Sequence, residues 1–376
     1  MMRERTWQGL PSRFSAEGVV LDCAGSQPEE TVLAAWLARH QLPSVVDVTS
    51  LPSGEGVRLA LKPPLLAAWL PGWDALGLRA RLNRSALSLV QEIILCLLAS
   101  PVAMRFPSLA ELDAAIEARA GMVDVGLQTR LAFRTDAAER PAAFWSYTPG
   151  EGFTLRPGVD LIAGVRAALL PEVADEAYDF SCYRASEYVV LAGMLPVIAR
   201  VNPPLYAALE AQWRQSPIMS GPFHDTFLRE YGSADAPVPP GFYIPGDRVW
   251  FRNPDERSAD VSGFEGSWVI YLGSGVFTNL WDPTQPFDLT RKAVEIYHWR
   301  DGVVADDRGE WVMDEARVAQ EVEKTLACPD RLFAILERML RYRDGRGIYA
   351  DGGCLDTTRE APRWMSAGVA DFHWSA

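Results

Sequence analysis

The chain has 376 residues, 48% of them hydrophobic and 23% charged, which is the composition of a soluble globular protein with room for two domains. Its formal net charge is −13 and it has no basic run that could follow a phosphate backbone, which argues against nucleic acid and membranes as partners. Five scattered cysteines without a CxxC pair, and four histidines without metal-ligand spacing, predict a reducing compartment and neither a metal nor another cofactor.

The first residues, MMRERTWQGLPSRF, are charged and are not followed by the apolar stretch of a secretory signal. The longest apolar stretch, residues 88–99, is too short to span a bilayer. We therefore expect a cytoplasmic protein, and leave export as an effector open.

Residues 1–100 are rich in Ala, Leu and Pro and carry no chemical motif. Helical patterns at residues 29–39 and 86–99, and a short strand at 44–48, are separated by prolines that end each element. The pattern predicts a helical N-terminal extension over residues 1–100.

The pattern changes after residue 107. Ser108 followed by Glu111 predicts a capped helix, and residues 142–157 predict a β-hairpin. A long helix is predicted to begin near Cys182. Residues 245–251, 267–273 and 292–299 are predicted strands, and residues 310–342 are predicted helices. The predicted core therefore spans residues 101–300, and residues 301–376 form a mostly helical C-terminal extension.

Cys182 is the first candidate for chemistry. Asp179 and Ser181 are residue types that cap helix N-termini, so the sulfur is predicted to lie in the first turn of a long helix. The helix dipole and unpaired N–H groups there favour a thiolate, which predicts a depressed pKa. The alternative from position alone is a small buried apolar residue, the usual role of a free cysteine. Glu187, offset from Cys182 by five residues, is predicted at the surface.

Six fragments then occur in an order that is similar to one family. They resemble those of spore-coat-type bacterial protein-glutamine gamma-glutamyltransferases (transglutaminases), whose core is similar to the papain-like fold of NlpC-type cysteine peptidases. The fragments are SPVAMRFPSLAEL, EGFTLRP, YDFSCYRA, FHDTF around His224, GDRVWFRNPD and FEGSWVIYLG. The resemblance implies an α/β (α+β) fold with a papain-like core, flanked by the two extensions.

The resemblance also implies an activity, which is acyl transfer or deamidation on protein glutamine with Cys182 as nucleophile. The partners would be a glutamine-bearing protein or peptide and either water or a lysine amine. The catalytic glutamate of the family falls on Ser267, and its histidine falls on Asn279 or Leu280. A serine hydroxyl does not accept a proton near neutral pH, so Ser267 cannot be the general base alone.

Three explanations for this departure stay open. In the first, a neighbouring residue replaces the base, either Glu265 on the same predicted strand or His298 on the strand predicted at 292–299. In the second, the chain is a catalytically degenerate binding or structural module. In the third, the cysteine carries chemistry that needs no strong base, such as slow deamidation.

The flanking aromatic residues Tyr183, Trp281 and Phe277 are candidate substrate-binding residues, with ordinary packing as the alternative. The insertion at residues 279–291 adds Asp282 as a further candidate. Period-two alternation places Ser267, with residues 269 and 271, on one face of its strand, and the resemblance predicts that this face turns toward Cys182.

Overall fold

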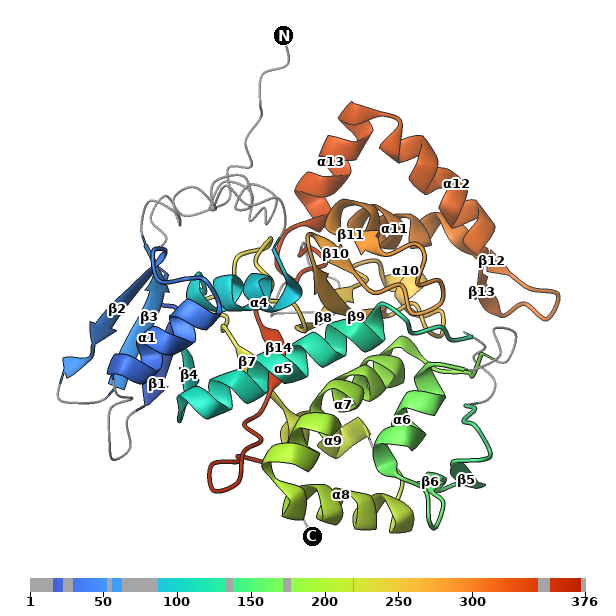
Figure 1. The fold of residues 1–376 in the computed structure, drawn as a ribbon. Coiled ribbons are helices and arrows are strands. Elements are labelled where there is room, and N and C mark those ends of the chain that lie inside the picture. The colour runs from blue at the N-terminus through green and yellow to red at the C-terminus, as the bar shows by residue number, and fades with distance from the viewer. Residues whose placement is uncertain are drawn as a thin grey trace.

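The computed structural model describes residues 16–22, 30–52, 56–62, 87–132, 138–171, 177–218, 220–343 and 352–372, which combine helices with two main sheets (Figure 1). Within this part of the chain no helix has the length and apolar character needed to cross a membrane. The α/β class and the papain-like arrangement predicted from the sequence agree with this architecture.

The N-terminal part of the described chain is a four-stranded sheet with the strand order β2-β3-β1-β4. Its elements are β1 (Val19–Asp22), α1 (Glu30–Arg39), β2 (Val46–Ser50), β3 (Gly56–Leu61), α4 (Leu89–Leu98) and β4 (Met104–Phe106). The sequence predicted both helices but only one strand, so a purely helical extension is wrong. The missed signal is the alternation of Val57, Leu59 and Leu61, which bury one face of β3.

A six-stranded sheet with the order β11-β10-β9-β8-β14-β7 forms the centre of the molecule. Its strands are β7 (Leu228–Tyr231), β8 (Arg248–Arg252), β9 (Gly266–Gly273), β10 (Val276–Phe277), β11 (Phe287–Asp288) and β14 (Arg359–Pro362), with the short helix α10 (Glu256–Ala259) after β8. β14 lies antiparallel between β7 and β8. The end of the chain therefore belongs to the central sheet, which corrects its description as a helical extension.

One face of this sheet is covered by helices from the middle of the chain. They are α5 (Leu109–Gly126), α6 (Leu161–Leu169), α7 (Cys182–Val201), α8 (Pro203–Gln215) and α9 (Ser220–Phe227), accompanied by the hairpin β5 (Trp145–Thr148) and β6 (Gly152–Leu155). α5 and α7 cross so closely that a Cβ on Gly193 would lie 2.4 Å from Cγ of Met122. The predicted hairpin and the predicted helix beginning at Cys182 are both confirmed.

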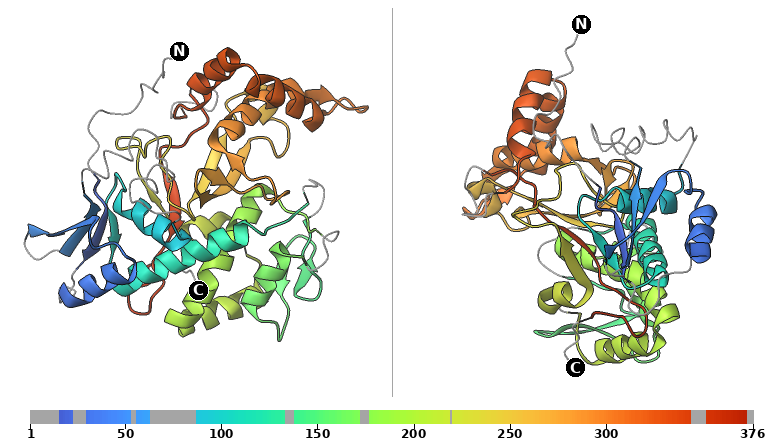
Figure 2. Two further views of the ribbon diagram at one scale, coloured as in Figure 1. Left: turned by 45° about the horizontal axis from the view of Figure 1, so that its top comes forward. Right: turned by 90° about the vertical axis from the view of Figure 1, so that its left-hand side faces the viewer.

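The other face is covered by α11 (Leu289–Gly302), α12 (Glu315–Leu326) and α13 (Pro329–Met339), with the ribbon β12 (Val303–Ala305) and β13 (Trp311–Met313) at one end. Both views in Figure 2 keep these orange helices on one side of the yellow strands and the green helices on the other. The strand predicted at residues 292–299 is wrong, because these residues lie inside α11.

The alternation of β9 decides which side chains meet α7. Ile270 packs in the same core as Val189 and Val190 of α7, whereas Val269 and Tyr271 pack with α11. The face that carries Ser267 therefore turns toward α11, and the prediction that it faces the cysteine helix is wrong.

Candidate active site

Cys182 is the first residue of α7. Ser181 before it has an extended backbone, and its side-chain oxygen accepts a hydrogen bond of 3.3 Å from the Arg184 N–H. This N-cap ends the extended segment before Ser181, and the helix of 20 residues begins at the cysteine. Cys182 is partly exposed as a residue, while the surrounding protein encloses much of its thiol, which the raised pKa of Cys182 reflects.

The sulfur of Cys182 meets the backbone of β9. The N–H of Tyr271 donates to Asp247 on the β8 side, whereas the N–H of Ile270 donates to Thr278 on the opposite side. By this alternation the N–H of Trp268 also points away from β8, and it donates to the Cys182 sulfur. The start of α7 thus contacts β9 at the residue that follows Ser267.

Two cations act on this sulfur. Lys292 is in the first turn of α11, with only 4% of its side chain exposed, and its Nζ lies 3.1 Å from Oε2 of Glu295. The same ammonium lies 3.6 Å from the centre of the Phe287 ring. Arg248 is 1% exposed and its guanidinium lies 3.7 Å from the centre of the Trp268 ring.

The net pKa shift of Cys182 is upward. Burial raises the pKa, and this effect exceeds the lowering by the N–H groups of Trp268 and Tyr183 and by the charges of Lys292 and Arg248. The predicted depressed pKa is therefore wrong in direction. The helix terminus supplies the expected stabilisation of the thiolate, but the surrounding protein removes more solvation than the terminus replaces.

A pocket of about 610 Å³ opens beside α11 and α12. Its wall includes Asn279 and Phe287, together with the carboxylates of Glu295, Glu315 and Glu323. Glu295 is in the wall of this pocket and also forms an ion pair with Lys292, whose charge acts on Cys182.

Comparison with protein families gives one match that spans most of the chain. The family model described as protein-glutamine gamma-glutamyltransferase matches residues 78–345, which is more than half of the sequence. The chain belongs to this transglutaminase family. A comparison with curated protein sequences gives no significant match. Among solved structures, the transglutaminase of Geobacillus stearothermophilus without its C-terminal extension is similar over 57% of this chain and 98% of that chain, with 18% identity and a TM-score of 0.38.

Neither of the two candidates for a replacement base is among the main groups that act on the Cys182 sulfur. Glu265 is exposed and accepts a hydrogen bond of 3.3 Å from the Gly263 N–H in its own turn. His298 is fully buried in α11, and its ring nitrogens lie 2.6 Å from Oδ2 of Asp301 and 2.7 Å from Oγ1 of Thr325. Both nitrogens of His298 are therefore committed to packing between α11 and α12.

Asn279 and Asp282 organise the loop that follows β10. The Asn279 side chain donates to the Gln285 carbonyl and accepts from the N–H groups of Trp281 and Asp282. Asp282 in turn accepts from Thr284, a hydrogen bond that lowers the pKa of the Asp282 carboxyl. The two residues shape the border of the pocket as a hydrogen-bonded turn.

The aromatic candidates divide into two groups. Phe277 is 1% exposed in the core beneath the sheet, so it cannot line a surface groove. Tyr183 is half-buried and packs edge-on against Trp268 beside the sulfur, and Trp281 borders a small surface hollow with Asp282. Of the three aromatic candidates, Tyr183 is therefore the residue next to Cys182.

Sequence reasoning missed three groups that act on the Cys182 sulfur, namely the N–H of Trp268 and the side chains of Arg248 and Lys292. Trp268 acts through its backbone, which no residue pattern reveals, and Arg248 and Lys292 come from elements far apart in the sequence. Glu187 is buried rather than exposed and pairs with Arg184 at 2.9 Å. The sequence gives no sign that Lys292 is buried, because this depends on the partner Glu295 that compensates its charge in the folded chain.

Proposed function

We propose that this member of the transglutaminase family transfers the acyl group of protein glutamine side chains through a thioester on Cys182. The observation that carries the proposal is the surroundings of the sulfur. A partly exposed cysteine opens a long helix, two backbone N–H groups donate to its sulfur, and the charges that act on it are the cations Lys292 and Arg248. Each of these groups stabilises a thiolate over a thiol.

In the first half-reaction the sulfur attacks the γ-carboxamide carbon of glutamine. A C–S bond forms, the C–N bond breaks, and the proton of the thiol leaves with ammonia. In the second half-reaction an amine attacks the thioester and forms an isopeptide bond, or water attacks it and leaves glutamate. Either acceptor returns its proton to the sulfur and regenerates the thiol.

Lys292 replaces one effect of a general base, because its positive charge stabilises the Cys182 thiolate. Ser267 stands where the resemblance expects the family's glutamate, and its hydroxyl does not accept the thiol proton near neutral pH. A buried ammonium held by Glu295 lowers the free energy of the thiolate instead, without accepting the proton. The reaction then depends on the thiolate fraction that the solvent pH sets, and it is slow at neutral pH.

The pocket beside α11 suits the amine acceptor. A lysine side chain or a small diamine combines an ammonium with an apolar stem, which matches carboxylates next to aromatic rings. Glu295, Glu315 and Glu323 supply the carboxylates, and Phe287 and Trp299 supply the rings. Glu295 in the wall of this pocket pairs with Lys292, whose charge acts on Cys182.

A second candidate is a non-catalytic module that binds glutamine-bearing peptides. Its support is that the charged side chains acting on the sulfur are both cations, so the strongest influences on Cys182 include no proton acceptor. A binding module would use the same surroundings of Cys182 as the enzyme. The two candidates differ in one measurable quantity, the release of ammonia.

The experiment measures ammonia release from a glutamine-containing peptide, with and without a fluorescent primary amine. Cys182→Ala should lower the rate by at least about 10³-fold, since removal of a nucleophile leaves little residual catalysis. Cys328→Ala, an exposed cysteine, is the matched control and should leave the rate unchanged. Glu315→Gln should weaken amine incorporation but not ammonia release. Peptide binding by the wild type without ammonia release at pH 9 would establish the binding module instead.

A further inference from the structure

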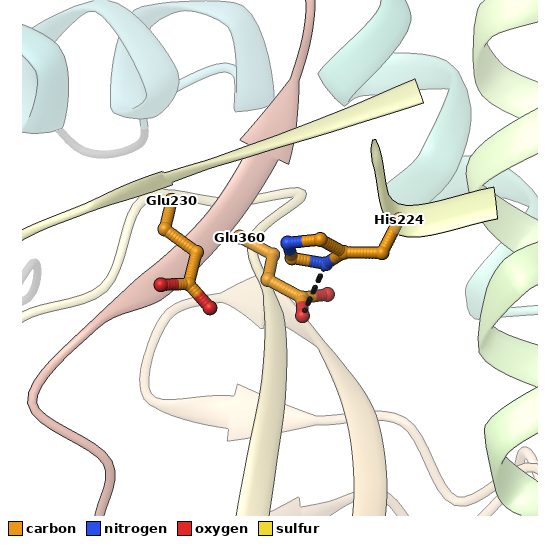
Figure 3. A group of neighbouring side chains, drawn as sticks. All are labelled: His224, Glu230 and Glu360. Carbon is orange, nitrogen blue, oxygen red and sulfur yellow. Dashed lines mark ion pairs between the residues drawn. The ribbon is translucent and has the colours of Figure 1, made fainter. Parts of the chain in front are cut away.

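His224, Glu230 and Glu360 form a second cluster, which Arg248 links to the surroundings of the Cys182 sulfur. Their side chains converge from α9, β7 and β14 (Figure 3). Nδ1 of His224 lies 3.0 Å from Oε1 of Glu360. One donor atom from each of the three residues lies within 4.8 Å of the other two.

The strand register brings the two carboxylates together. Glu230 and Glu360 are directly opposite each other in the antiparallel pair of β7 and β14, so both side chains lie on one face of the sheet. Two like charges in directly opposite positions destabilise a sheet unless a cation compensates them. The compensating cations are Arg248, whose guanidinium pairs with Oε2 of Glu360, and the imidazole of His224 beside Oε1 when it is protonated, a charge that a divalent ion would replace.

We propose that this cluster binds a divalent transition-metal ion such as Zn²⁺, with His224, Glu230 and Glu360 as its protein ligands. One imidazole and two carboxylates are a donor set that first-row divalent ions accept, whereas Ca²⁺ prefers six to eight oxygens. The proposal adds a site to the proposed acyl-transfer function and does not depend on it.

The distances require only a small adjustment. Two ligand atoms at Zn–N and Zn–O distances of about 2.1 Å and a tetrahedral angle are roughly 3.4 Å apart. The His224–Glu360 separation of 3.0 Å would therefore open by a few tenths of an ångström. Glu230 is exposed and His224 is one-third exposed, so Glu230 can rotate inward and water can take the remaining position.

The outer contacts of the cluster orient the buried ligand. Arg248 holds Glu360, and its Nε donates to Oγ of Ser186 on α7 at 2.8 Å. A ligand carboxylate fixed by such a partner is characteristic of metal centres. Occupation of the site would tie α9 to β7 and β14, and should therefore stabilise the folded chain.

The binding test uses the full-length protein in the Cys182→Ala background, so that the reactive thiol cannot supply the metal ligand. After treatment with a chelator, titration calorimetry with Zn²⁺ and the visible absorption of Co²⁺ should both report one equivalent. His224→Ala and Glu230→Gln should each weaken binding by at least about 100-fold, the upper end of the loss seen when only outer partners are removed. Asp225→Asn, an exposed neighbour on α9, should bind like the parent.

Thermal unfolding adds an independent readout. Saturating Zn²⁺ should raise the Tm of the parent and of Asp225→Asn but not of His224→Ala or Glu230→Gln. Glu230→Gln changes an exposed residue without altering its size, so it keeps the comparison valid if His224→Ala unfolds. The proposal is overturned if the parent binds no equivalent of Zn²⁺, or if both ligand variants bind it as tightly as the parent.

Discussion

Helices α7 and α11 lie on opposite faces of β9, and each begins with a side-chain cap, from Ser181 and Asp288 respectively. Cys182 is in the first turn of α7, and the charge of Lys292 in the first turn of α11 acts to lower the pKa of Cys182. Further along α11, His298 has the chemistry of a catalytic base and is used entirely in packing. The position of a group in the fold, here at a helix start beside β9, therefore decides more than its residue type whether it acts on the cysteine.

The comparison predicts a steep pH dependence at Cys182. Because burial raises its pKa above the ordinary 9.0, the thiolate fraction should rise about tenfold per pH unit up to that value, roughly 100-fold from pH 7 to pH 9. The measurement is iodoacetamide labelling followed by peptide mapping. Cys354, whose pKa burial raises to about 12, serves as the unreactive reference. A labelling rate that levels off below pH 8 would contradict the upward shift.

His298→Ala should separate packing from chemistry. Removal of the ring leaves Asp301 and Thr325 without their buried partner, which should lower the free energy of unfolding by about 2 kcal/mol. Chemical denaturation measures this loss. Cys182 labelling in the folded variant should match the wild type, and a large drop in labelling with unchanged stability would make His298 a catalytic partner after all.

Lys292→Met should show how much the second helix contributes to the thiolate. Loss of the ammonium should slow Cys182 labelling about tenfold at a fixed pH below the pKa, equivalent to an upward pKa shift of about one unit. The exposed Lys324→Met is the matched control and should label at the wild-type rate. Equal labelling rates for the two variants would show that Lys292 does not stabilise the Cys182 thiolate.

Ser267→Glu should produce the smallest change, a gain of a few-fold in ammonia release. A well-placed general base contributes about 10²–10⁴-fold, but the Ser267 face turns toward α11, so a carboxylate there reaches the sulfur poorly. Ser267→Gln, of similar size without the charge, is the control. An increase that the glutamine variant shares would be a packing effect rather than restored base catalysis.

The sequence predicted α7 because its signals are local and agree. Ser181 is a capping residue, and the apolar residues that follow it continue for several turns. In α11 the short run at residues 292–299 also fits strand alternation, so Val294 and Ile296 suggested a strand although Ala293, Val294 and Ile296 are buried as in a helix. A short apolar run does not distinguish the two periods.

The site was less predictable than the fold because its members act through tertiary contacts. The N–H of Trp268 has no signature in the sequence, and the direction of the Ser267 face depends on which helix packs on which side of β9. The His224–Glu360 contact joins residues 136 positions apart, so spacing along the chain gave no sign of a metal-ligand set.

The central claim is that Cys182 carries the acyl group. Incubation with a glutamine-containing peptide, acid quench and mass-spectrometric mapping should find a thioester adduct on the Cys182 peptide, with the mass of the substrate less ammonia. The adduct should disappear on addition of a primary amine and should be absent from Cys182→Ala. Ammonia release by Cys182→Ala at the wild-type rate, or an adduct on another cysteine, would contradict the account.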